Sequence, residues 1–593
     1  MTYRAPVREL SFCLEAVADL PALVETGAYP DYDPDLAQAV LDAAGQFASE
    51  VLAPLNTIGD REGSTCANGA VRAAPGFADA YRQFAEGGWL SLAAPARWGG
   101  QALPKALELA AFEAFHAANM AFGLCPMLSQ AAIEALEAHG TPEQQERYLT
   151  RLVSGEWTGA MVLTEPQAGS DLGALNATAV PNGDGTYRLS GQKIFITWGD
   201  HDMTDNIVHL VLARLPDAPP GSRGISLFLA PKFLVNEDGS LGARNSFRPV
   251  SVEHKLGIHA SPTCVMAYED ARAELVGRPN EGLAHMFTMM NAARLAVGVE
   301  GVAIAERAYQ QALAYAVDRR QGRSVWTGEA NAPIFDHPDV RRMLVLMKAK
   351  IEAARAICLS CAVAADQARH APEDARADWK RREDILTPIA KAWSTDVGCE
   401  VASLGVQIHG GMGFIEETGA AQHYRDARIA PIYEGTNGIQ AMDLVGRKLG
   451  QDGGLAAIAL IREMRETLVP LHGLFSGKPL ERLTAAVQAA EDATLWLLDR
   501  KKDPEAGADV LAAAEPYLKL MGDVTGGWLL AKGALAARAR LDAGENDPWL
   551  ESRISLYEAY AANVLGHASS RLAAIGQGGE LLSRFTPEVL AAQ

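Results

Sequence analysis

The segment IAPIYEGTNGIQ, residues 429–440, places a single carboxylate among residue types that could support proton transfer. Glu434 follows a short apolar run and an aromatic residue, and apolar surroundings raise the pKa of a carboxyl group toward neutral pH. A carboxylate with such a pKa can serve as a general base. From these residues alone, an exposed loop glutamate remains the more frequent alternative, so both interpretations stay open.

Two further segments have polar groups that could hold a ligand. Residues 163–171 (LTEPQAGSD) form a loop of small and hydroxyl-bearing residues after a β-rich run, and such a loop can hold a phosphate or polar ring edges. An ordinary turn is the more common alternative. Residues 193–199 (KIFITWG) are equally ambiguous when taken alone.

Common catalytic motifs are missing from the sequence. It contains no GxGxxG between a strand and a helix, no Walker A motif, no HExxH and no GxSxG. Cys358 and Cys361 form a lone CxxC in a helical pattern, without the second CxxC or His cluster of a zinc site. We therefore expect both to be small core residues and the seven scattered cysteines to be reduced.

Helical and β-rich patterns alternate along the first half of the chain. Residues 34–155 have helical signals, including an N-cap and a first-turn proline at Thr141 and Pro142. Residues 157–276 consist of short β-rich runs, with turn signals at 182–185 and at Asp238-Gly239. This order predicts a β domain inserted between helical domains.

Long helical patterns return in the second half. Residues 294–317, 338–368 and 384–408 have apolar positions three and four apart, as in the helices of a bundle. The sequence QDGG at 451–454 is a plausible linker, and an Ala- and Leu-rich helical pattern follows it. The tail is therefore predicted to be a separate helical domain.

Composition excludes several classes of protein. The 593 residues are 48% hydrophobic and 21% charged, which is typical of a globular protein with more than one domain. The net charge of −20 disfavours nucleic acid as a partner. No apolar run approaches the ~18 residues that a membrane helix needs, and the first residues lack the apolar core of a signal peptide. We expect a cytoplasmic protein without an integral membrane segment.

Taken together, the segments resemble one protein family. MVLTEPQAGSDLGA, KIFITWG, VQIHGGMGF with YRDARI, and IYEGTNGIQ occur in the order and approximate spacing found in acyl-CoA dehydrogenases, and GWLSLAAPARWGG is similar to their N-terminal domain. The resemblance covers about residues 35–448. The short N-terminal extension and the helical tail resemble the extended branch that includes 3-methylmercaptopropionyl-CoA dehydrogenases.

This resemblance implies an α+β multidomain fold with FAD between a middle β-barrel and a four-helix bundle. The domains expected are an N-terminal extension (1–34), an N-terminal helical domain (35–157), the barrel (158–280), the bundle (281–449) and an extra C-terminal helical domain (455–593).

The family pattern also implies a role for individual residues. Contacts to FAD within one subunit are expected from Leu163, Thr164, Gly169, Ser170, Phe195, Ile196, Thr197 and Thr436. Contacts to the FAD of a neighbouring subunit are expected from Arg319, Gln407, Gly410 and Gly411, which implies at least a homodimer. Contacts to the acyl-CoA are expected from Ser170, Asn291, Arg294, Tyr433 and Gly435.

Glu434 matches the catalytic base of the family. Some branches carry their base just before the arginine that matches Arg294, but that position is Ala293 here. Phe195 stands where many members have Trp. The pattern at Arg319 is altered and is followed by an apparent insertion, which makes Arg320 an alternative to Arg319. Gln422 occupies a usual Lys/Arg position.

The implied activity is FAD-dependent α,β-dehydrogenation of an acyl-CoA thioester to trans-2-enoyl-CoA, with electrons passed to electron-transfer flavoprotein. Either 3-methylmercaptopropionyl-CoA or a medium- or long-chain fatty acyl-CoA would be the substrate. An acyl-CoA oxidase is one alternative. The other is a non-catalytic, flavin-bearing, nucleic-acid-binding homologue, which the net charge of −20 disfavours.

Overall fold

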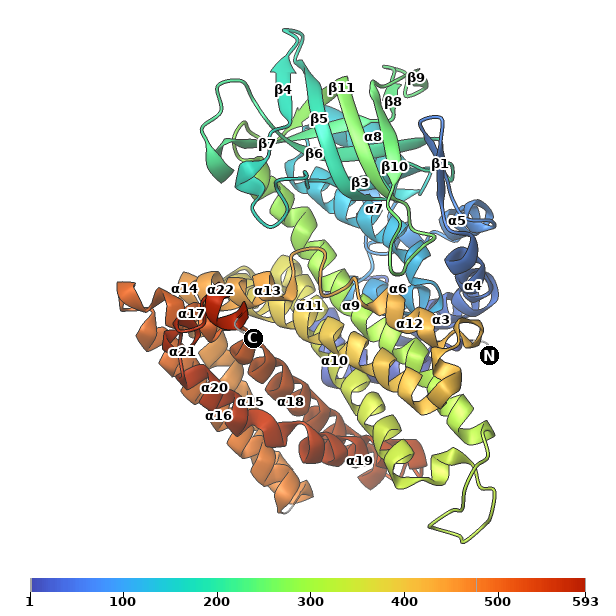
Figure 1. Cartoon of the computed structure of the whole chain (residues 1–593), viewed down its shortest axis with the longest axis vertical. Helices are drawn as coiled ribbons and strands as arrows, with labels where there is room; N and C mark the ends of the chain where they lie inside the picture. Colours follow the sequence, from blue (N-terminus) through green and yellow to red (C-terminus); the bar gives the residue numbers. More distant parts are fainter. Residues whose placement is uncertain (1–2, 476, 592–593) are drawn as a thin grey trace.

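The computed structural model describes residues 3–475 and 477–591. A β-rich part lies at one end of the molecule, long helices cross the middle, and the C-terminal helices pack on their far side (Figure 1). One apolar core runs through the N-terminal, central and C-terminal helices, and a second, smaller core fills the β-rich part. The fold is therefore α+β and multidomain, as predicted.

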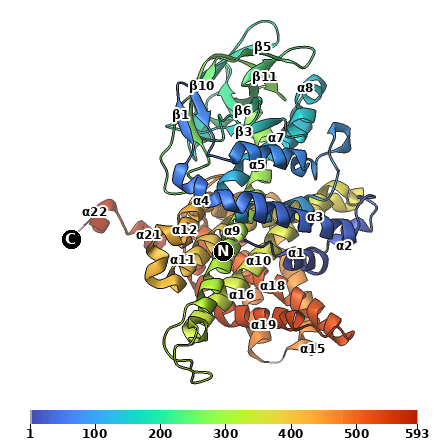
Figure 2. The same cartoon turned by 90° about the vertical axis from the view of Figure 1, so that its right-hand side faces the viewer.

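The N-terminal part is helical except for one hairpin. Its helices are α1 (Val7–Phe12), α2 (Leu20–Val24), α3 (Pro34–Phe47), α4 (Ala53–Glu62), α5 (Phe77–Glu86), α6 (Lys105–Ala118), α7 (Met120–His139) and α8 (Pro142–Val153). In the view of Figure 2, α3 and α4 lie in front of the long helices in the middle of the molecule, and α5 lies above them, toward the β-rich part.

The hairpin corrects the purely helical expectation for residues 34–155. Strands β1 (Thr65–Ala67) and β2 (Ala70–Arg72) pair antiparallel around Asn68-Gly69, with φ of 52° and 71° at these two residues. An Asn-Gly pair favours this two-residue turn because both positions need positive φ. The Asn-Gly turn signal was present in the sequence, but the two strands were missed because they are short and have little apolar character.

The predicted start of α8 is confirmed and includes a second contact. The backbone N–H of Gln144 donates to the Thr141 hydroxyl oxygen at 3.3 Å, and the Gln144 side-chain oxygen accepts from the Thr141 N–H at 3.0 Å. This reciprocal capping box satisfies two of the N–H groups that have no partner within the helix.

Strands β4, β5, β6, β7 and β11 close into a small barrel. Around the ring β11 pairs with β5, β5 with β4, β4 with β6, β6 with β7, and β7 with β11, while β10 and β3 extend it on either side. Turns at 182–185 and 238–239 connect strands as predicted. The strands are β3 (Trp157–Val162), β4 (Thr178–Pro181), β5 (Thr186–Thr197), β6 (Asn206–Arg214), β7 (Ile225–Pro231), β8 (Phe233–Val235), β9 (Leu241–Arg244), β10 (Phe247–Val252) and β11 (Thr263–Val276).

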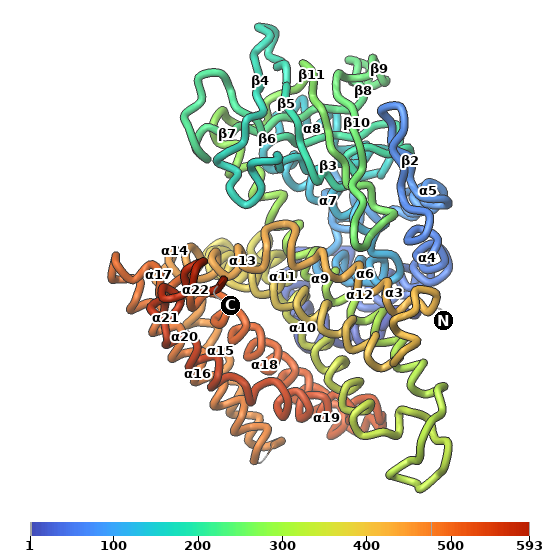
Figure 3. Tube along the Cα trace, viewed as in Figure 1, coloured from blue at the N-terminus to red at the C-terminus, as the bar shows by residue number. Residues whose placement is uncertain are grey.

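Three long helices form the centre of the molecule: α9 (Gly282–Asp318), α10 (Pro338–His370) and α11 (Glu373–His409). Helix α11 begins at Glu373, earlier than the expected residue 384. The sequence pattern missed this start because the first turns are highly charged and show no apolar periodicity. Helices α12 (Ala420–Ala427) and α13 (Asn437–Asp443) follow, and the connection between α9 and α10 extends away from the bundle (Figure 3). Cys358 and Cys361 are buried in α10, which confirms their core placement.

The C-terminal helices pack against α10 and α11. The Trp393 indole of α11 donates to the Asp523 carboxylate at 3.0 Å, and Arg571 donates to the other oxygen of Asp523 at 2.6 Å. A Cβ on Gly522 would lie 2.2 Å from the Trp393 ring, so only glycine fits there. The helices are α14 (Leu449–Gln451), α15 (Leu455–Leu474), α16 (Lys478–Arg500), α17 (Gly507–Ala512), α18 (Ala514–Asp542), α19 (Pro548–Asn563), α20 (Ala568–Gly576), α21 (Glu580–Ser583) and α22 (Pro587–Ala591).

Within the described residues, one helix is long and apolar enough to span a bilayer, judged by length and composition alone. It is α9, and 78% of its most apolar window is buried inside the structure. That burial is what a helix in a protein core shows.

Candidate active site

Glu434 lies on a strained turn between α12 and α13. Its φ is 54°, and that of Gly435 is 80°, so two consecutive residues adopt the left-handed conformation. A non-glycine residue in this region costs about 1–3 kcal/mol and persists only where the surrounding contacts hold it. The Gln440 side-chain amide supports the turn by donating to the backbone carbonyls of Glu434 and Gly435, at 3.4 Å each.

Asn437 ties the same turn to α11. Its side-chain N–H groups donate to the Asp396 carboxylate at 2.8 Å and to the Ala392 carbonyl at 3.0 Å. Its side-chain oxygen accepts from the Lys391 ammonium at 2.9 Å. The position of Glu434 is therefore set by contacts to a long, buried helix.

A cavity of about 340 Å³ opens between the barrel, α7, the start of α9 and the Glu434 turn. It brings together many of the residues expected to contact cofactor or substrate. Those that line it are Leu163, Thr164, Gly169, Ser170, Phe195, Ile196, Thr197, Arg294, Glu434 and Gly435. Segments that are remote in the sequence thus share one cavity.

The charges around Glu434 suit a general base. Its side chain is half-buried at the cavity wall, and desolvation raises its pKa to about 7, while the positive charges of Arg294 and Lys391 partly oppose that rise. Burial also lowers the pKa of Lys391 to about 8. A carboxyl group with a pKa near neutral pH can take up a proton and release it again.

Arg294 is oriented by one neighbour on its own helix, α9, and by one on α13. It is buried, lies 3.7 Å from the Asp443 carboxylate, and donates to the Asn291 side-chain oxygen at 3.4 Å. Its Nε has no hydrogen-bond partner within the described residues. Asn291 thus contacts Arg294 without lining the cavity itself.

Two expected site residues point elsewhere within the single chain. The Tyr433 hydroxyl donates to Glu300 of α9, and the Thr436 hydroxyl caps α13 by accepting from the Ile439 N–H at 3.1 Å. Neither side chain lines the cavity. Their direct contacts to substrate and FAD stay predictions.

The cavity wall fits the flavin that the family resemblance implies. The Phe195 side chain is 58% exposed although it is aromatic, and its backbone is left-handed with a φ of 59°. Such a ring at a cavity wall matches a flat, apolar partner. The hydroxyls of Ser170 and Thr197 have no hydrogen-bond partner among the described residues, and a Cβ on Gly169 would meet nothing within 4 Å. These groups offer hydrogen bonds and room for close approach.

The residues expected to reach a neighbouring subunit lie away from this cavity. Arg319 caps the far end of α9, while Gln407, Gly410 and Gly411 lie at the end of α11, and all four are exposed. Their role toward a partner's cofactor stays a prediction. Arg320, the alternative to Arg319, is engaged within the chain: it donates to a Glu329 carboxylate oxygen and to the Asn331 carbonyl, each at 2.7 Å.

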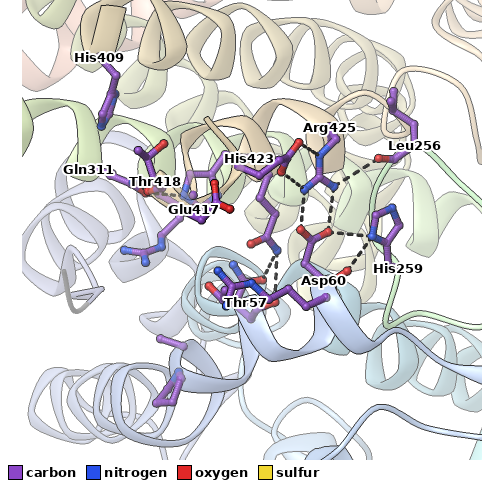
Figure 4. A pocket seen from close by; sticks show the side chains of 18 of the residues that line it. Thr57, Asp60, Leu256, His259, Gln311, His409, Glu417, Thr418, His423 and Arg425 are labelled. Carbon is purple, nitrogen blue, oxygen red and sulfur yellow. Dashed lines mark hydrogen bonds and ion pairs between the residues drawn. The ribbon is translucent and has the colours of Figure 1, made fainter. Parts of the chain in front are cut away.

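A larger cavity, about 1040 Å³, lies between α4, α9, α12 and the connection between β10 and β11 (Figure 4). Arg425 donates to the Asp60 carboxylate at 2.8 Å, and Asp60 lies 3.0 Å from His259. Gln422, at the usual Lys/Arg position, donates to the Asn56 side chain at 3.1 Å. The polar side chains named here pair with one another along the wall of this cavity, and Glu434 is not among the residues that line it.

Two residues near Glu434 were missed in the sequence: Glu300 and Lys391. Both are buried, and each is a lone charged residue within an apolar stretch of a long helix. Because charged residues are almost never fully buried without a reason, this pattern could have identified them.

Comparisons with known proteins agree with this geometry. Family models match in order: "Acyl-CoA dehydrogenase, N-terminal domain" at residues 34–156, "middle domain" at 160–271, "C-terminal domain" at 280–449, and "Acetyl-CoA dehydrogenase C-terminal like" at 460–585.

Relatives match over nearly their whole length. A 3-methylmercaptopropionyl-CoA dehydrogenase of Ruegeria pomeroyi is 48% identical over 98% of this chain and 99% of its own. A broad-specificity linear acyl-CoA dehydrogenase of Mycobacterium tuberculosis is 32% identical over 95% of both chains. The structure of an acyl-CoA dehydrogenase complexed with FAD from Bacillus anthracis covers 95% of this chain and 90% of its own, with a TM-score of 0.74 and 21% identity, and supports the fold alone.

Proposed function

Because this chain belongs to the acyl-CoA dehydrogenase family, whose members are FAD-binding oxidoreductases that act on a CH–CH bond, we propose that Glu434 is its catalytic base. The observation that carries this proposal is the position of Glu434. A carboxyl group with a pKa of about 7 lines the same cavity as Phe195 and Thr197.

In the proposed reaction, Glu434 removes the proton from the α-carbon of the thioester. FAD held at the cavity wall by residues such as Phe195 and Thr197 would supply the two-electron acceptor for the hydride that leaves the β-carbon, and the product would be trans-2-enoyl-CoA. The positive charges of Arg294 and Lys391 favour the ionised form of Glu434 before this step. Gly435 keeps the turn free of a side chain, so that the thioester can approach the backbone closely.

The proposed substrate is 3-methylmercaptopropionyl-CoA. The support is the 48% identity, over nearly all of both chains, to the Ruegeria pomeroyi enzyme with that name. Straight-chain acyl-CoA is the alternative, supported by the 32% identity to the broad-specificity linear enzyme. The apolar walls contributed by Leu128, Met161 and Met290 are compatible with either chain.

We also propose electron-transfer flavoprotein as the electron acceptor and a homodimer as the working assembly. The dimer proposal is supported by the exposure of Gln407, Gly410 and Gly411, which the family pattern assigns to a neighbouring cofactor. An oxidase would instead reduce oxygen, so comparing reoxidation by the two acceptors distinguishes these activities. Sedimentation of the purified protein tests the dimer, and cell fractionation tests the predicted cytoplasmic location.

The decisive experiment is anaerobic addition of an acyl-CoA panel to wild type and to Glu434→Gln while the visible flavin absorbance is followed. We expect 3-methylmercaptopropionyl-CoA to bleach the flavin of wild type, and Glu434→Gln to bind it without bleaching. Absence of flavin, or of bleaching by every acyl-CoA, would contradict the proposed activity. Bleaching by straight-chain substrates alone would assign the alternative substrate class.

A further inference from the structure

We propose that Glu300 is a positioning residue for Glu434, that it works as a neutral carboxylic acid, and that it acts through the hydroxyl of Tyr433. This inference rests on the proposed function, because it requires Glu434 to be the base. It is based on the contacts that hold the turn at Glu434 and Gly435, on the side away from the cavity residues, to the helices α9 and α11.

Glu300 occupies an unusual position in the middle of α9. Its side chain is 0% exposed, and within the described residues its one hydrogen-bond partner is the Tyr433 hydroxyl, which donates to one carboxyl oxygen. The other oxygen has no partner, and no ion pair forms with Glu300 in this part of the chain. An ionised carboxylate left so uncompensated is costly, so the neutral acid is the favoured form.

Charged groups near Glu300 act on its pKa in both directions. From the turn it faces Tyr433 and Glu434, and from α11 it faces Lys391. Burial is the main cause that raises the pKa of Glu300 to about 8; the negative charge of Glu434 adds to the rise, while the Tyr433 hydrogen bond and the positive charge of Lys391 oppose it. Burial exceeds the opposing effects, so Glu300 favours its protonated form.

The contact with Tyr433 matters because of the backbone that follows it. Tyr433 directly precedes the left-handed pair Glu434 and Gly435. On the C-terminal side, Asn437 and Gln440 hold this pair through the hydrogen bonds described above. On the N-terminal side, the hydrogen bond from the Tyr433 hydroxyl to Glu300 connects the turn to α9 through side chains. Without it, the turn can relax and move the carboxylate away from the substrate α-carbon.

Three variants and a matched control test this role. Glu300→Gln keeps a neutral group that can accept the Tyr433 hydrogen bond, Glu300→Ala removes the group, and Tyr433→Phe removes only the hydroxyl. Glu306→Gln is the control, because Glu306 is also a buried glutamate of α9 but binds Arg355 and Lys348 instead. For each variant, the rate of anaerobic flavin bleaching, the acyl-CoA Kd and the exchange of the substrate α-hydrogen into D₂O are measured.

We expect the conservative variant to keep the rate and the other two to lose it. Glu300→Ala and Tyr433→Phe should bleach flavin and exchange the α-hydrogen about tenfold to a hundredfold more slowly, the scale of a misplaced catalytic group, with Kd within about threefold of wild type. The double variant should be no slower than Glu300→Ala alone, because both changes remove one contact. Glu306→Gln should lower the Tm and leave the bleaching rate unchanged.

A stability measurement tests the neutral form without flavin chemistry. An unfolded chain releases the Glu300 proton near the usual glutamate value of about 4.3, whereas the folded chain holds it until about pH 8. Wild type should therefore lose stability relative to Glu300→Gln as pH rises between these values. A constant difference in Tm across this window would overturn the neutral-acid role.

The remaining outcomes are equally decisive. A folded Glu300→Ala that bleaches flavin at the wild-type rate overturns the positioning role, as does a Tyr433→Phe variant with the wild-type rate if Glu300→Ala does not fold. A Glu300→Gln variant as slow as Glu300→Ala shows that a charge is needed instead. Failure of wild type itself to bleach is a failure of the proposed function and is recognised separately.

Discussion

At the scale of single residues, the behaviour of Glu434 follows from two opposing effects. Burial at the cavity wall favours its protonated form, while the charges of Arg294 and Lys391 favour its ionised form. Burial is the larger effect, so the pKa settles at about 7 instead of near 4.5. The base is therefore divided between its two forms at neutral pH.

This balance predicts the pH dependence of the reaction. Only ionised Glu434 can take the α-proton, so the rate of anaerobic flavin bleaching should rise with pH and level off above a midpoint of about 7. Well below the midpoint, the rate should change about tenfold per pH unit, as for one titrating group. Stopped-flow absorbance with acyl-CoA well below saturation, which reports the pKa of the free enzyme, measures this profile. A rate that stays flat through neutral pH would show that another group sets it.

Removal of a nearby positive charge should shift this profile. The charge of Lys391 lowers the pKa of Glu434, so Lys391→Met should move the midpoint upward, by about one pH unit. Lys532→Met is a suitable control, because the Lys532 ammonium also donates to a carbonyl, that of Val17 at 2.9 Å, but is in α18. The same stopped-flow profile should be unshifted in the control. A downward shift in Lys391→Met would contradict the assigned electrostatics.

At the scale of elements, α9 and α11 approach closely enough to bring Glu300 and Lys391 to the same turn. Glycines permit this approach. A Cβ on Gly301 would lie 2.5 Å from the Ser394 carbonyl oxygen, and one on Gly398 would lie 2.8 Å from the Gly301 carbonyl oxygen. Real Cβ atoms do not pack so closely, so the distance between the two helices depends on these glycines.

Gly301→Ala should therefore separate the helices slightly, at a cost of about 1–3 kcal/mol in stability, and should slow flavin bleaching. Gly473→Ala in α15 is the control, because a Cβ there meets nothing within 4 Å. That change should be neutral or stabilising by up to about 1 kcal/mol. Thermal unfolding and the bleaching rate report the two effects. Equal Tm values for the two variants would rule out close packing as the constraint.

Sequence patterns predicted the elements where local signals are strong. The start of α8 at Thr141 and the two turns at 182–185 and 238–239 follow from capping and turn residues alone. The charged beginning of α11 was missed, because a polar helix carries no apolar stripe. The family resemblance predicted that Phe195 and Glu434 belong to one site, and in the structure both line one cavity. Residues such as Glu300 were missed because their proximity arises only from the packing of helices.

At the scale of the whole molecule, a buried ion cluster joins parts that are far apart in the sequence. Arg355 of α10 donates to Glu113 of α6, with a shortest distance of 2.6 Å, and to Glu306 of α9 at 3.0 Å. It also pairs with Glu352 at 3.0 Å, which in turn lies 3.3 Å from Arg553 of α19. The N-terminal helices, the bundle and the C-terminal helices thus share one electrostatic contact.

Arg355→Met tests how far this cluster connects the parts. The side chain of Arg355 is fully buried, so its removal leaves Glu113, Glu306 and Glu352 without their central cation. Breaking a buried pair in this way costs about 3–5 kcal/mol, because the remaining charges stay desolvated. Arg82→Met is the control: Arg82 forms exposed pairs with Asp79 and Glu86, and exposed pairs contribute little to stability because water screens them.

Because a multidomain chain often unfolds irreversibly, the measurement is hydrogen exchange at native conditions, with resistance to proteolysis as a second readout. In Arg355→Met, exchange should accelerate in α6 and α19 together, since Arg355 binds Glu113 of α6 directly and is linked to Arg553 of α19 through Glu352. The Arg82→Met control should match wild type in both helices. Faster exchange confined to α10 would show that the cluster is a local contact, and that apolar packing alone connects the N-terminal and C-terminal helices to the bundle.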